Sequence, residues 1–303
     1  MKYIVTGGAG FIGSNLVDKL VSQNHEVMVF DNLSSGFISN LNDKCTFINL
    51  DISDVQNSQE MIYHMKNANA VFHLASMPRV QPSIKNPIKF EKNNSLGTVN
   101  LLNCAVKSNV KRFIYSASSS AYGNTDKIPM KEGDPVNPIS PYAMQKYYGE
   151  VICRTFNKVY GIETVSLRYF NVYGERQSLD GAYALVIGAF AKMKKNNKPL
   201  TIRGDGNQER DFTYVQDIVT ANILASTSPN VGKGEVINIG NGNSKSINDI
   251  AKLFGGDVTY IDPVIEPLRT LADNSLAKKL LGWVPTGNLE NWILNYKKKL
   301  GID

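Results

Sequence analysis

The first half of the chain alternates short β-branched apolar runs with longer runs in which apolar residues recur every three or four positions. The short runs predict strands and the longer ones predict amphipathic helices. The predicted strands are residues 2–6, 25–30, 45–50, 70–75, 111–117 and 163–168. The predicted helices are residues 11–21, 87–108 and 141–160. Alternating strands and helices predict an α/β fold with a parallel, doubly wound Rossmann sheet.

The pattern becomes less regular after residue 169. A loop is predicted at 171–180, helices at 182–195, 247–254 and 275–281, and strands at 211–215 and 235–239 that are expected to return to the sheet. We therefore predict a dinucleotide-binding Rossmann domain at 1–170, to which segment 211–240 returns. Residues 171–303 are predicted to form mainly a smaller C-terminal substrate-binding lobe, over the carboxyl ends of the strands where ligands bind in such sheets.

Composition is that of a soluble folded protein. The chain has 303 residues, of which 42% are hydrophobic and 20% charged. No apolar run approaches the ~20 residues of a membrane span, and the apolar stretch at residues 3–5 is too short for a signal peptide. These features predict a cytoplasmic protein that has no membrane partner.

Charge and metal-ligand content exclude several other classes. The net charge of +6 permits an anionic ligand. The lysine runs at 192–198 and 297–299 lack interleaved aromatics, which argues against nucleic-acid binding. Cys45, Cys104 and Cys153 are far apart and form no CxxC, so neither a disulfide framework nor a zinc site is expected. His73 is interpreted as a packed residue near a cofactor, and no metal is predicted.

A glycine-rich turn separates the first predicted strand from the first predicted helix. Its sequence at residues 8–13, GAGFIG, fits G-x-G-x-x-G. Glycine lets the backbone approach a pyrophosphate, and the following helix N-terminus offers N–H groups and positive dipole. The alternative is a tight turn that binds nothing. The strand–turn–helix context favours a dinucleotide, held by Gly7, Gly10, Phe11, Ile12 and Gly13.

Asp31 ends the second predicted strand, where this fingerprint places a ribose-binding acid. A carboxylate accepts both ribose hydroxyls and repels a 2′-phosphate, so we predict NAD rather than NADP. The cofactor contacts are extended to Asn32, Ser35 and Gly36 in the following loop. Asp51 and Ile52, after the third strand, are expected at the adenine edge, although a helix N-cap is an equally good interpretation of Asp51.

Tyr142 and Lys146 lie four residues apart on a predicted helix and therefore share one face. Ser140 as N-cap and Pro141 at the first helical position fix where that helix begins. A tyrosine base needs its pKa lowered from ~10 toward 7, about 4 kcal/mol. One cation at ~4 Å and an effective dielectric of ~20 supplies about that much, and Lys146 is predicted to be that cation. The serines at 116 and 118–120 end the fifth strand and offer a hydroxyl to share the proton. The alternative is that Tyr142 and Lys146 form an ordinary i,i+4 pair on the surface of the helix.

With these residues in place, the chain resembles the extended short-chain dehydrogenase/reductases over nearly its whole length. Within them it is similar to the nucleotide-sugar 4-epimerases that act on UDP-glucose and UDP-N-acetylglucosamine. The segments that carry the resemblance are TGGAGFIG at 6–13, Tyr142-x-x-x-Lys146, LRYFNVYG at 167–174 and GDGNQERDF at 204–212.

The resemblance implies roles for individual residues. The family's catalytic hydroxyl corresponds to Ser118. Its tyrosine base corresponds to Tyr142, and the lysine that accompanies the base corresponds to Lys146. The implied cofactor neighbours are Leu74, Ala75, Ser76, Asn94, Ser116, Tyr169 and Phe170. The implied substrate contacts are Ser83 near the sugar, Asn171 and Arg210 at the diphosphate, and Ala184, Leu185, Thr201 and Arg203 around uridine. The family also associates as a homodimer through two long helices, which predicts pairing through 87–108 and 141–160.

Two departures from family patterns choose between reactions. Related 4,6-dehydratases carry Asp-Glu after the catalytic hydroxyl, whereas this chain has Ser119 and Ser120. Elimination of water needs that second acid/base, so dehydration is not expected.

The family usually places an arginine for the diphosphate before a Gly-Asp pair in the last third of the chain, and that pattern is missing here. Arg269 is expected to substitute for that arginine or else to be a surface residue. Thr270 falls at the position whose side-chain bulk decides whether an N-acetyl group fits beside the sugar. A threonine is small, so N-acetylhexosamines are predicted to fit.

The sequence thus predicts an NAD-dependent UDP-hexose 4-epimerase with a UDP-sugar as its partner. The alternatives are a nucleotide-sugar oxidoreductase, a 4,6-dehydratase, and a non-catalytic dinucleotide sensor. The sensor has no need of the Tyr142/Lys146 pair.

Overall fold

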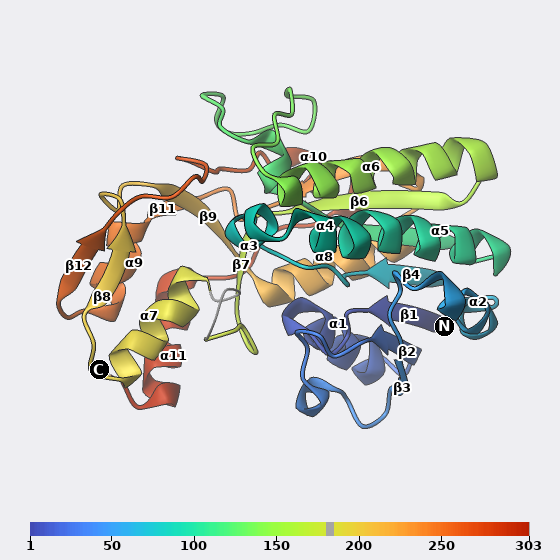
Figure 1. Cartoon of the computed structure of the whole chain (residues 1–303), viewed down its shortest axis with the longest axis horizontal. Coiled ribbons are helices and arrows are strands. Elements are labelled where there is room, and N and C mark those ends of the chain that lie inside the picture. Colours follow the sequence, from blue (N-terminus) through green and yellow to red (C-terminus); the bar gives the residue numbers. More distant parts are fainter. Residues whose placement is uncertain (180–184, 303) are drawn as a thin grey trace.

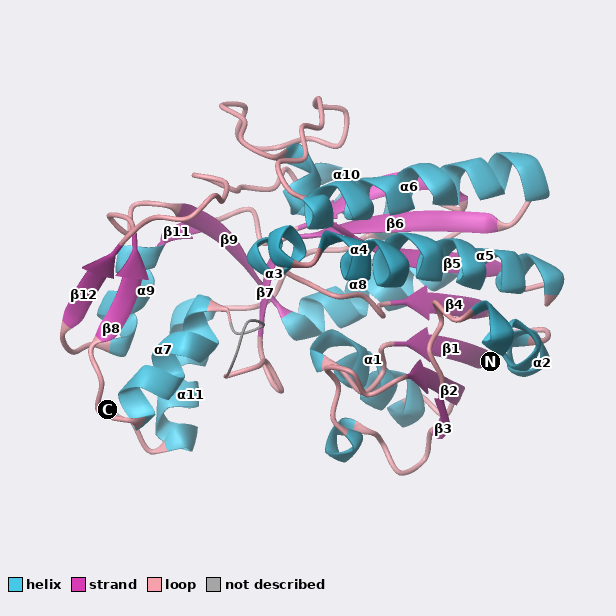
Figure 2. Ribbon diagram, in the orientation of Figure 1, coloured by secondary structure: helices cyan, strands magenta, loops and turns pink. Residues whose placement is uncertain are grey.

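The computed structural model describes residues 1–179 and 185–302, and in these residues seven parallel strands form the main sheet (Figures 1 and 2). This confirms the predicted α/β fold. The strands are β1 (Lys2–Thr6), β2 (Glu26–Asp31), β3 (Thr46–Asn49), β4 (Ala70–His73), β5 (Arg112–Ser118), β6 (Glu163–Tyr169) and β10 (Lys233–Ile239).

The strand order is β10-β6-β5-β4-β1-β2-β3, with Tyr3 of β1 paired to Val27 on one side and to Ala70 on the other. The chain winds outward from β1 to β3 and then continues from β4 in the opposite direction. The switch between β1 and β4 leaves a crevice outside the carboxyl ends of these strands, where open α/β sheets bind their ligands.

Helices cover both faces because successive side chains of a strand point to opposite sides. On one face, α1 (Phe11–Ser22), α8 (Val215–Thr227) and α10 (Ser275–Leu281) pack with Tyr3 and Val5. On the other, α2 (Ser58–Met65), α5 (Gly97–Lys107) and α6 (Pro141–Tyr160) pack with Ile4. The predicted bounds of α6 and α10 are confirmed.

The helix predicted at 87–108 is not continuous. It divides into α4 (Pro87–Glu91), a π-helical segment (Lys92–Leu96) and α5, and it is preceded by the short α3 (Val80–Lys85). A π segment widens the helix locally and redirects a side chain. Here it places the buried Asn94 toward the segment that follows β4.

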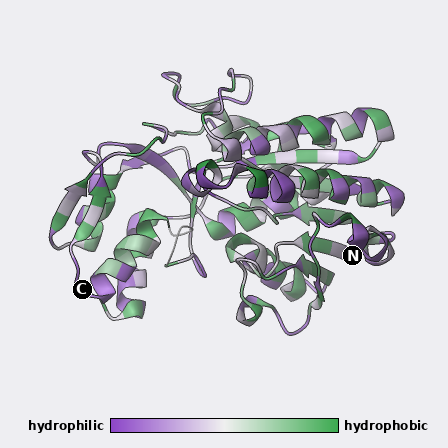
Figure 3. Ribbon diagram, viewed as in Figure 1, coloured by the Kyte–Doolittle hydropathy of each residue, from purple (hydrophilic) through white to green (hydrophobic). Residues whose placement is uncertain are grey.

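The C-terminal lobe has a separate hydrophobic core, lined by residues such as Phe190, Ile250 and Phe254. Figure 3 shows hydrophobic stretches on the ribbons of both the main sheet and this lobe. The lobe contains α7 (Val186–Lys195), β8 (Leu200–Arg203), β9 (Glu209–Tyr214), β11 (Ser244–Ser246), α9 (Ile247–Phe254), β12 (Val258–Ile261) and α11 (Leu289–Leu300). Residues 182–184 of the predicted helix 182–195 lie outside the described residues.

One predicted strand is in a different sheet. β9 pairs with β7 (Asn171–Tyr173) and β11 rather than with the main sheet, so the expectation for residues 211–215 was wrong. The reason is that β6 ends at Tyr169, where the Phe170 N–H bonds the Ile239 carbonyl and β7 leaves the sheet. β10 does join the main sheet, as predicted for residues 235–239.

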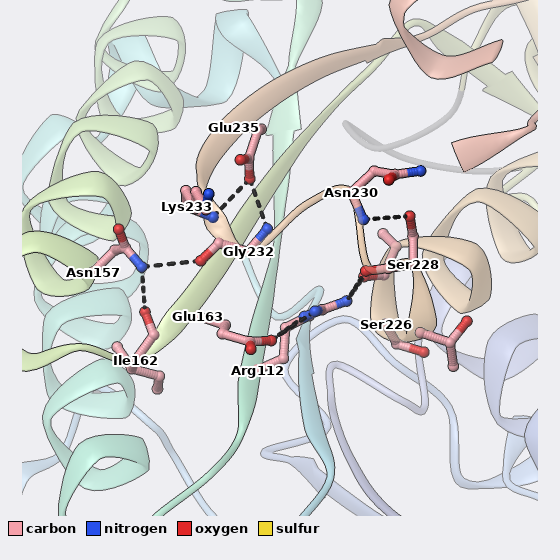
Figure 4. Close-up of polar contacts among 12 residues, drawn as sticks. Arg112, Asn157, Ile162, Glu163, Ser226, Ser228, Asn230, Gly232, Lys233 and Glu235 are labelled. Atoms are coloured by element: carbon pink, nitrogen blue, oxygen red, sulfur yellow. Dashed lines mark hydrogen bonds and ion pairs between the residues drawn. The ribbon is translucent and has the colours of Figure 1, made fainter. Parts of the chain in front are cut away.

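Polar contacts fasten β10 at its amino end (Figure 4). Arg112 pairs with Glu163 on the neighbouring strand and donates to the Ser228 carbonyl at 2.9 Å. The Asn157 amide donates to the Gly232 carbonyl at 2.9 Å. These contacts fix the start of β10, the edge strand of the main sheet beside β6.

Short 3-10 turns at Ile38–Asn40, Val55–Asn57 and Ser119–Tyr122 complete the described elements. None of the described helices combines the length and the apolarity needed to cross a lipid bilayer.

Candidate active site

The glycine turn between β1 and α1 is shaped for close approach of a ligand. Gly7 has φ +71°, and a Cβ there would lie 2.7 Å from the Ala75 nitrogen. A Cβ on Gly13 would lie 2.1 Å from the Gly7 carbonyl oxygen. Gly10 caps α1 without a side-chain hydrogen bond, so the first helical N–H groups of this 12-residue helix face outward. This geometry fits a dinucleotide pyrophosphate, with Phe11 and Ile12 in the first turn.

Asp31 is buried at the carboxyl end of β2, beside the glycine turn. Its carboxylate accepts hydrogen bonds from the Ala9 N–H at 3.0 Å and the Leu33 N–H at 2.8 Å. Burial raises the pKa of this carboxyl, and the two backbone donors oppose that rise. The carboxylate is therefore oriented next to the turn, as a ribose-binding acid must be.

The loop after β2 packs on the same turn. The Phe37 N–H donates to the Ala9 carbonyl at 3.0 Å, and a Cβ on Gly36 would lie 2.8 Å from the Ala9 carbon. The structure thus brings Gly36 against the turn. The cofactor contacts of Asn32, Ser35 and Gly36 stay predictions.

Asp51 follows β3 and binds its own turn. Its carboxylate accepts from the Ser53 N–H at 2.8 Å and the Ser53 hydroxyl at 2.7 Å. The N-cap interpretation of Asp51 was wrong, because the turn at Val55–Asn57 is capped by Asp54 and α2 begins after Asn57. Ile52 is buried next to it. Contact of either residue with adenine stays a prediction.

The segment after β4 lies against the glycine turn. The Leu74 N–H donates to the Thr6 carbonyl, and the Ala75 N–H donates to the Thr6 hydroxyl. Asn94 binds the Met77 backbone on both sides, accepting from its N–H at 2.8 Å and donating to its carbonyl at 3.0 Å. Asn94 therefore positions the segment that contains Ser76.

His73 is a packed residue, as interpreted from the sequence. Its ring nitrogens contact the Thr6 hydroxyl at 2.9 Å and the Thr98 hydroxyl at 2.8 Å. Burial, and secondly the charge of Lys146, lower its pKa to about 3, which keeps the ring neutral. The described part of the chain holds no cluster of metal-ligating side chains.

The first turn of α6 places Tyr142 beside β5. Ser140 caps the helix, accepting from the Ala143 N–H at 3.2 Å. The Tyr142 N–H donates to the Ser83 hydroxyl at 3.1 Å. The Tyr142 phenol interacts through a hydrogen bond with Ser118, at the carboxyl end of β5. A phenol and a hydroxyl from different elements thus meet at the ligand-binding edge.

Lys146 lies one turn further along α6, almost fully buried. Its ammonium donates to the Ser116 carbonyl at 2.9 Å and is 6.0 Å from the centre of the Tyr142 ring. Burial lowers the pKa of this lysine to about 7. The structure therefore brings Ser116, Ser118, Tyr142 and Lys146 together.

The expectation that Lys146 lowers the pKa of Tyr142 stays a prediction. Burial raises the pKa of the phenol, and the groups that oppose the rise are the Ser118 hydroxyl and then the Arg79 guanidinium. The sequence analysis missed Arg79, for which the only signal was a cation in the segment after the fourth strand.

Arg210, predicted at the diphosphate, is buried at the start of the C-terminal lobe. Its guanidinium pairs with Glu266 at 2.8 Å and donates to the Glu209 carbonyl at 2.8 Å. Arg269 pairs with the Glu209 carboxylate at 3.0 Å. A backbone bridge between Glu209 and Arg269 brings the two arginines onto neighbouring segments.

Thr270 is also buried, and its hydroxyl accepts from the Asp211 N–H at 3.3 Å. Asp211 itself is fully buried and was missed from the sequence. Its carboxylate accepts from the N–H groups of Asn241 at 2.7 Å, Gly242 at 2.9 Å and Ala272 at 3.0 Å. It thereby joins β9, the end of β10 and the segment that carries Arg269.

Other predicted substrate residues are spread over the lobe. Asn171 begins β7, Leu185 caps α7, and Thr201 and Arg203 lie on β8. Ala184 lies outside the described residues. Their contacts with uridine or diphosphate stay predictions.

Three further predicted residues have side chains engaged within the protein. The Ser83 hydroxyl donates to the Val80 carbonyl at 2.6 Å while accepting from the Tyr142 N–H, so this buried side chain joins α3 to the first turn of α6. The Tyr169 phenol bonds the Asn222 amide on α8. Phe170 packs in a small buried cluster with Tyr122.

The model of the NAD dependent epimerase/dehydratase family matches residues 3–240. The chain belongs to the NAD-dependent epimerase/dehydratase family. A putative UDP-glucose 4-epimerase of Methanocaldococcus jannaschii is 39% identical over 96% of this chain and 98% of its own length.

Solved structures agree in fold along the chain. The UDP-glucose 4-epimerase of Thermotoga maritima, solved with UDP-glucose, has a TM-score of 0.93 at 37% identity and covers 99% of this chain and 100% of its own. The UDP-N-acetylglucosamine 4-epimerase of Methanobrevibacter ruminantium, solved with UDP-N-acetylmuramic acid, has a TM-score of 0.90 at 36% identity, covering 96% and 95%.

Family membership confirms three predictions: the resemblance to nucleotide-sugar epimerases, the cofactor NAD, and an enzyme of the isomerase class.

Proposed function

We propose that this protein is a UDP-hexose 4-epimerase that keeps NAD bound through its catalytic cycle. The observation that carries the proposal is the hydrogen-bonding contact between Ser118 and Tyr142, at the same sheet edge as the glycine turn and Asp31. A base next to a cofactor site suits removal of a proton from a sugar hydroxyl.

When bound, NAD supplies reversible hydride exchange at C4, through a 4-keto form of the sugar. In the proposed mechanism, the Tyr142 oxygen takes the proton of the C4 hydroxyl and later returns it. The Ser118 hydroxyl assists this proton transfer by forming a hydrogen bond with the phenol. Lys146, anchored on Ser116, is proposed to orient the cofactor side of the site.

Epimerisation requires that the sugar present both faces, so the nucleotide end should be held firmly and the sugar loosely. We assign the firm end to Asn171, Arg210 and Arg269, with Leu185, Thr201 and Arg203 around the base. Binding energy at the diphosphate then positions the reacting carbon without resisting its rotation.

The substrate range is proposed to include N-acetylhexosamines as well as UDP-glucose and UDP-galactose, because Thr270 is small. Dehydration is disfavoured by Ser119 and Ser120. The Ser120 hydroxyl bonds Ser118 at 2.9 Å, and a hydroxyl is a poor general acid near neutral pH.

Incubation of the purified protein with UDP-glucose or UDP-N-acetylglucosamine, without added cofactor, tests the proposal. The 4-epimers should appear until equilibrium. Consumption of added NADH with accumulation of a reduced sugar would instead show an oxidoreductase, and a 4-keto-6-deoxy product would show a dehydratase.

Tyr142→Phe provides the matched test of the base. Turnover should fall by several orders of magnitude while the Kd for UDP, measured by calorimetry, changes little. Equal loss of turnover and UDP affinity would contradict the assignment.

We also propose a homodimer formed through α4, α5 and α6. Apolar side chains are exposed along α4, the π segment and α6, among them Ile88, Leu96, Met144, Val151 and Val159. Sedimentation equilibrium should give twice the chain mass, and Val151→Asp should shift it toward the monomer. A monomeric wild-type protein would refute this.

We propose a cytoplasmic location because the three cysteines are not joined in disulfides. Cys45, Cys104 and Cys153 are all free thiols in the structure, as expected in a reducing compartment. Fractionation of cells that make the protein tests this location.

A further inference from the structure

The ammonium of Lys146 lies deep in the protein and has little polar compensation there. The side chain is almost fully buried, and its ammonium donates to the Ser116 carbonyl at 2.9 Å. An ammonium carries three N–H donors, and removal from water favours the neutral amine unless other groups stabilise the charge. The surroundings of Lys146 therefore decide how much of it is charged.

The carboxylates on α6 and on the neighbouring α4 are bound to other residues. Glu150, one turn after Lys146, pairs with Arg168 at 2.7 Å. Glu91 accepts a hydrogen bond from the Gln145 amide at 3.0 Å. Within the described parts of the chain, no carboxylate forms an ion pair with Lys146.

Two tyrosine rings face the ammonium instead. The Lys146 Nζ lies over the ring of Tyr115, 5.3 Å from its centre, and over the ring of Tyr142, 6.0 Å from its centre. The face of an aromatic ring attracts a cation within about 6 Å of its centroid, and it does so more strongly where water is excluded. Tyr115 is 1% exposed, so its contact with Lys146 is made out of water.

The close approach of α6 to the Tyr115 ring depends on Gly149. This glycine follows Lys146 by three positions and so lies on the same face of the helix. A Cβ on Gly149 would lie 2.1 Å from Cζ of Tyr115 and 2.2 Å from its hydroxyl oxygen. Glycine is unfavourable in a helix interior. Its presence in the middle of α6 indicates that direct contact between this helix and the Tyr115 ring is required.

The other titratable groups around Lys146 add no negative charge. His73 on β4 packs against Tyr115 with 5.6 Å between ring centres, and burial keeps it neutral by lowering its pKa to about 3. Burial raises the pKa of both Tyr115 and Tyr142, so both phenols are neutral near pH 7. Burial also lowers the pKa of Lys146 to about 7, which leaves its charge sensitive to any further interaction.

We propose that the face of the Tyr115 ring keeps Lys146 in its ammonium form, and that Tyr115 is thereby a positioning residue of this active site. The inference rests on the proposed function, in which Lys146 acts beside the base Tyr142. Tyr115 transfers no proton. Its ring attracts the ammonium, which donates to Ser116 and stays charged while Tyr142 takes and returns the proton of the sugar hydroxyl.

Fluorination of the ring tests this inference without any turnover. Tyr115→Phe keeps an aromatic face, so the pKa of Lys146 should stay close to that of the wild type. Monofluoro-, difluoro- and pentafluorophenylalanine at the same position keep the shape of the ring but progressively withdraw negative charge from its face. Across this series the pKa of Lys146 should fall stepwise by on the order of one unit, about a tenfold loss of ammonium relative to amine. A side chain that only filled space would show no dependence on the number of fluorines.

NMR of the full-length, NAD-saturated protein, with ¹³C at the lysine Cε positions, follows this titration. The signal of Lys146 is the one that is absent from Lys146→Met. Tyr3 provides the matched control, because it is also buried on the main sheet but packs on the opposite face, in the cluster that contains Leu16 of α1. The same fluorinated series at Tyr3 should leave the pKa of Lys146 unchanged.

A constant pKa of Lys146 throughout the series at Tyr115 would overturn the inference, as would an equal fall in the series at Tyr3. Neither result bears on the proposed function, which is tested separately by the loss of epimerisation in Tyr142→Phe.

Discussion

The ammonium of Lys146 donates a 2.9 Å hydrogen bond to the backbone carbonyl of Ser116. This contact joins α6 to β5 inside the active site. Because Lys146 is buried, its charged form is costly, and its pKa is lowered from 10.5 to about 7.

Lys146→Met should therefore be inactive yet more stable at low pH. The folded pKa lies below the unfolded one, so the cost of the buried charge is complete below pH 7 and fades as pH rises from 7 to 10.5. At about 1.4 kcal/mol per pKa unit, less about 1 kcal/mol for the lost hydrogen bond, the variant should gain roughly 4 kcal/mol near pH 6. The gain should shrink toward about pH 10.

Urea denaturation at the two pH values measures this difference. Lys111→Met, at an exposed position just before β5, should show no comparable pH dependence. A variant that is less stable than the wild type at both pH values would contradict the prediction.

A buried ion pair joins α6 to β6. Replacing only one of its two residues should lower the free energy of unfolding more than replacing both. Arg168 binds Glu150 through two hydrogen bonds of 2.8 and 2.7 Å, and both side chains are almost fully buried. Arg168→Met leaves an uncompensated carboxylate and should cost about 3–5 kcal/mol. Adding Glu150→Gln should recover a large part, measured by urea denaturation. A double variant as unstable as Arg168→Met alone would refute the account.

Asp211→Ala should loosen the segment that carries Arg269 and Thr270. It removes the acceptor of three buried backbone N–H groups, from Asn241, Gly242 and Ala272, and should cost about 2–4 kcal/mol. Because the last of these belongs to the segment near the proposed diphosphate site, KM for the UDP-sugar should rise more than kcat falls. Asp205→Ala, at an exposed loop, is the control. Unchanged stability and KM would show that Asp211 is not the anchor.

Thr270→Tyr should restrict the substrate range. Thr270 is buried beside Asp211, so added bulk has to project toward the proposed sugar site. Activity on UDP-N-acetylglucosamine should fall at least about tenfold, with a smaller change for UDP-glucose. Thr270→Ser keeps the hydroxyl and should leave both activities close to wild type. Equal losses on the two substrates in Thr270→Tyr would indicate general damage to the site.

Local signals were enough to predict much of the fold. Alternating strands and helices, the glycine turn at 8–13 and the Ser140-Pro141 start of α6 are each encoded within a few neighbouring residues. The same holds for Tyr142 and Lys146, whose spacing on a helix places them on one face. Pattern reasoning failed at β9, because the sheet that a strand joins depends on where the preceding strand ends.

The sequence by itself determined the doubly wound fold and the dinucleotide turn, and it placed Tyr142 and Lys146 on one face of a helix. Only the tertiary structure decided what these two residues contact. Ser83 and Tyr142 are 59 positions apart and are joined by a hydrogen bond between α3 and α6. Burial likewise decided the pKa values of Lys146 and Asp211, since the desolvation of a charge depends on everything packed around it.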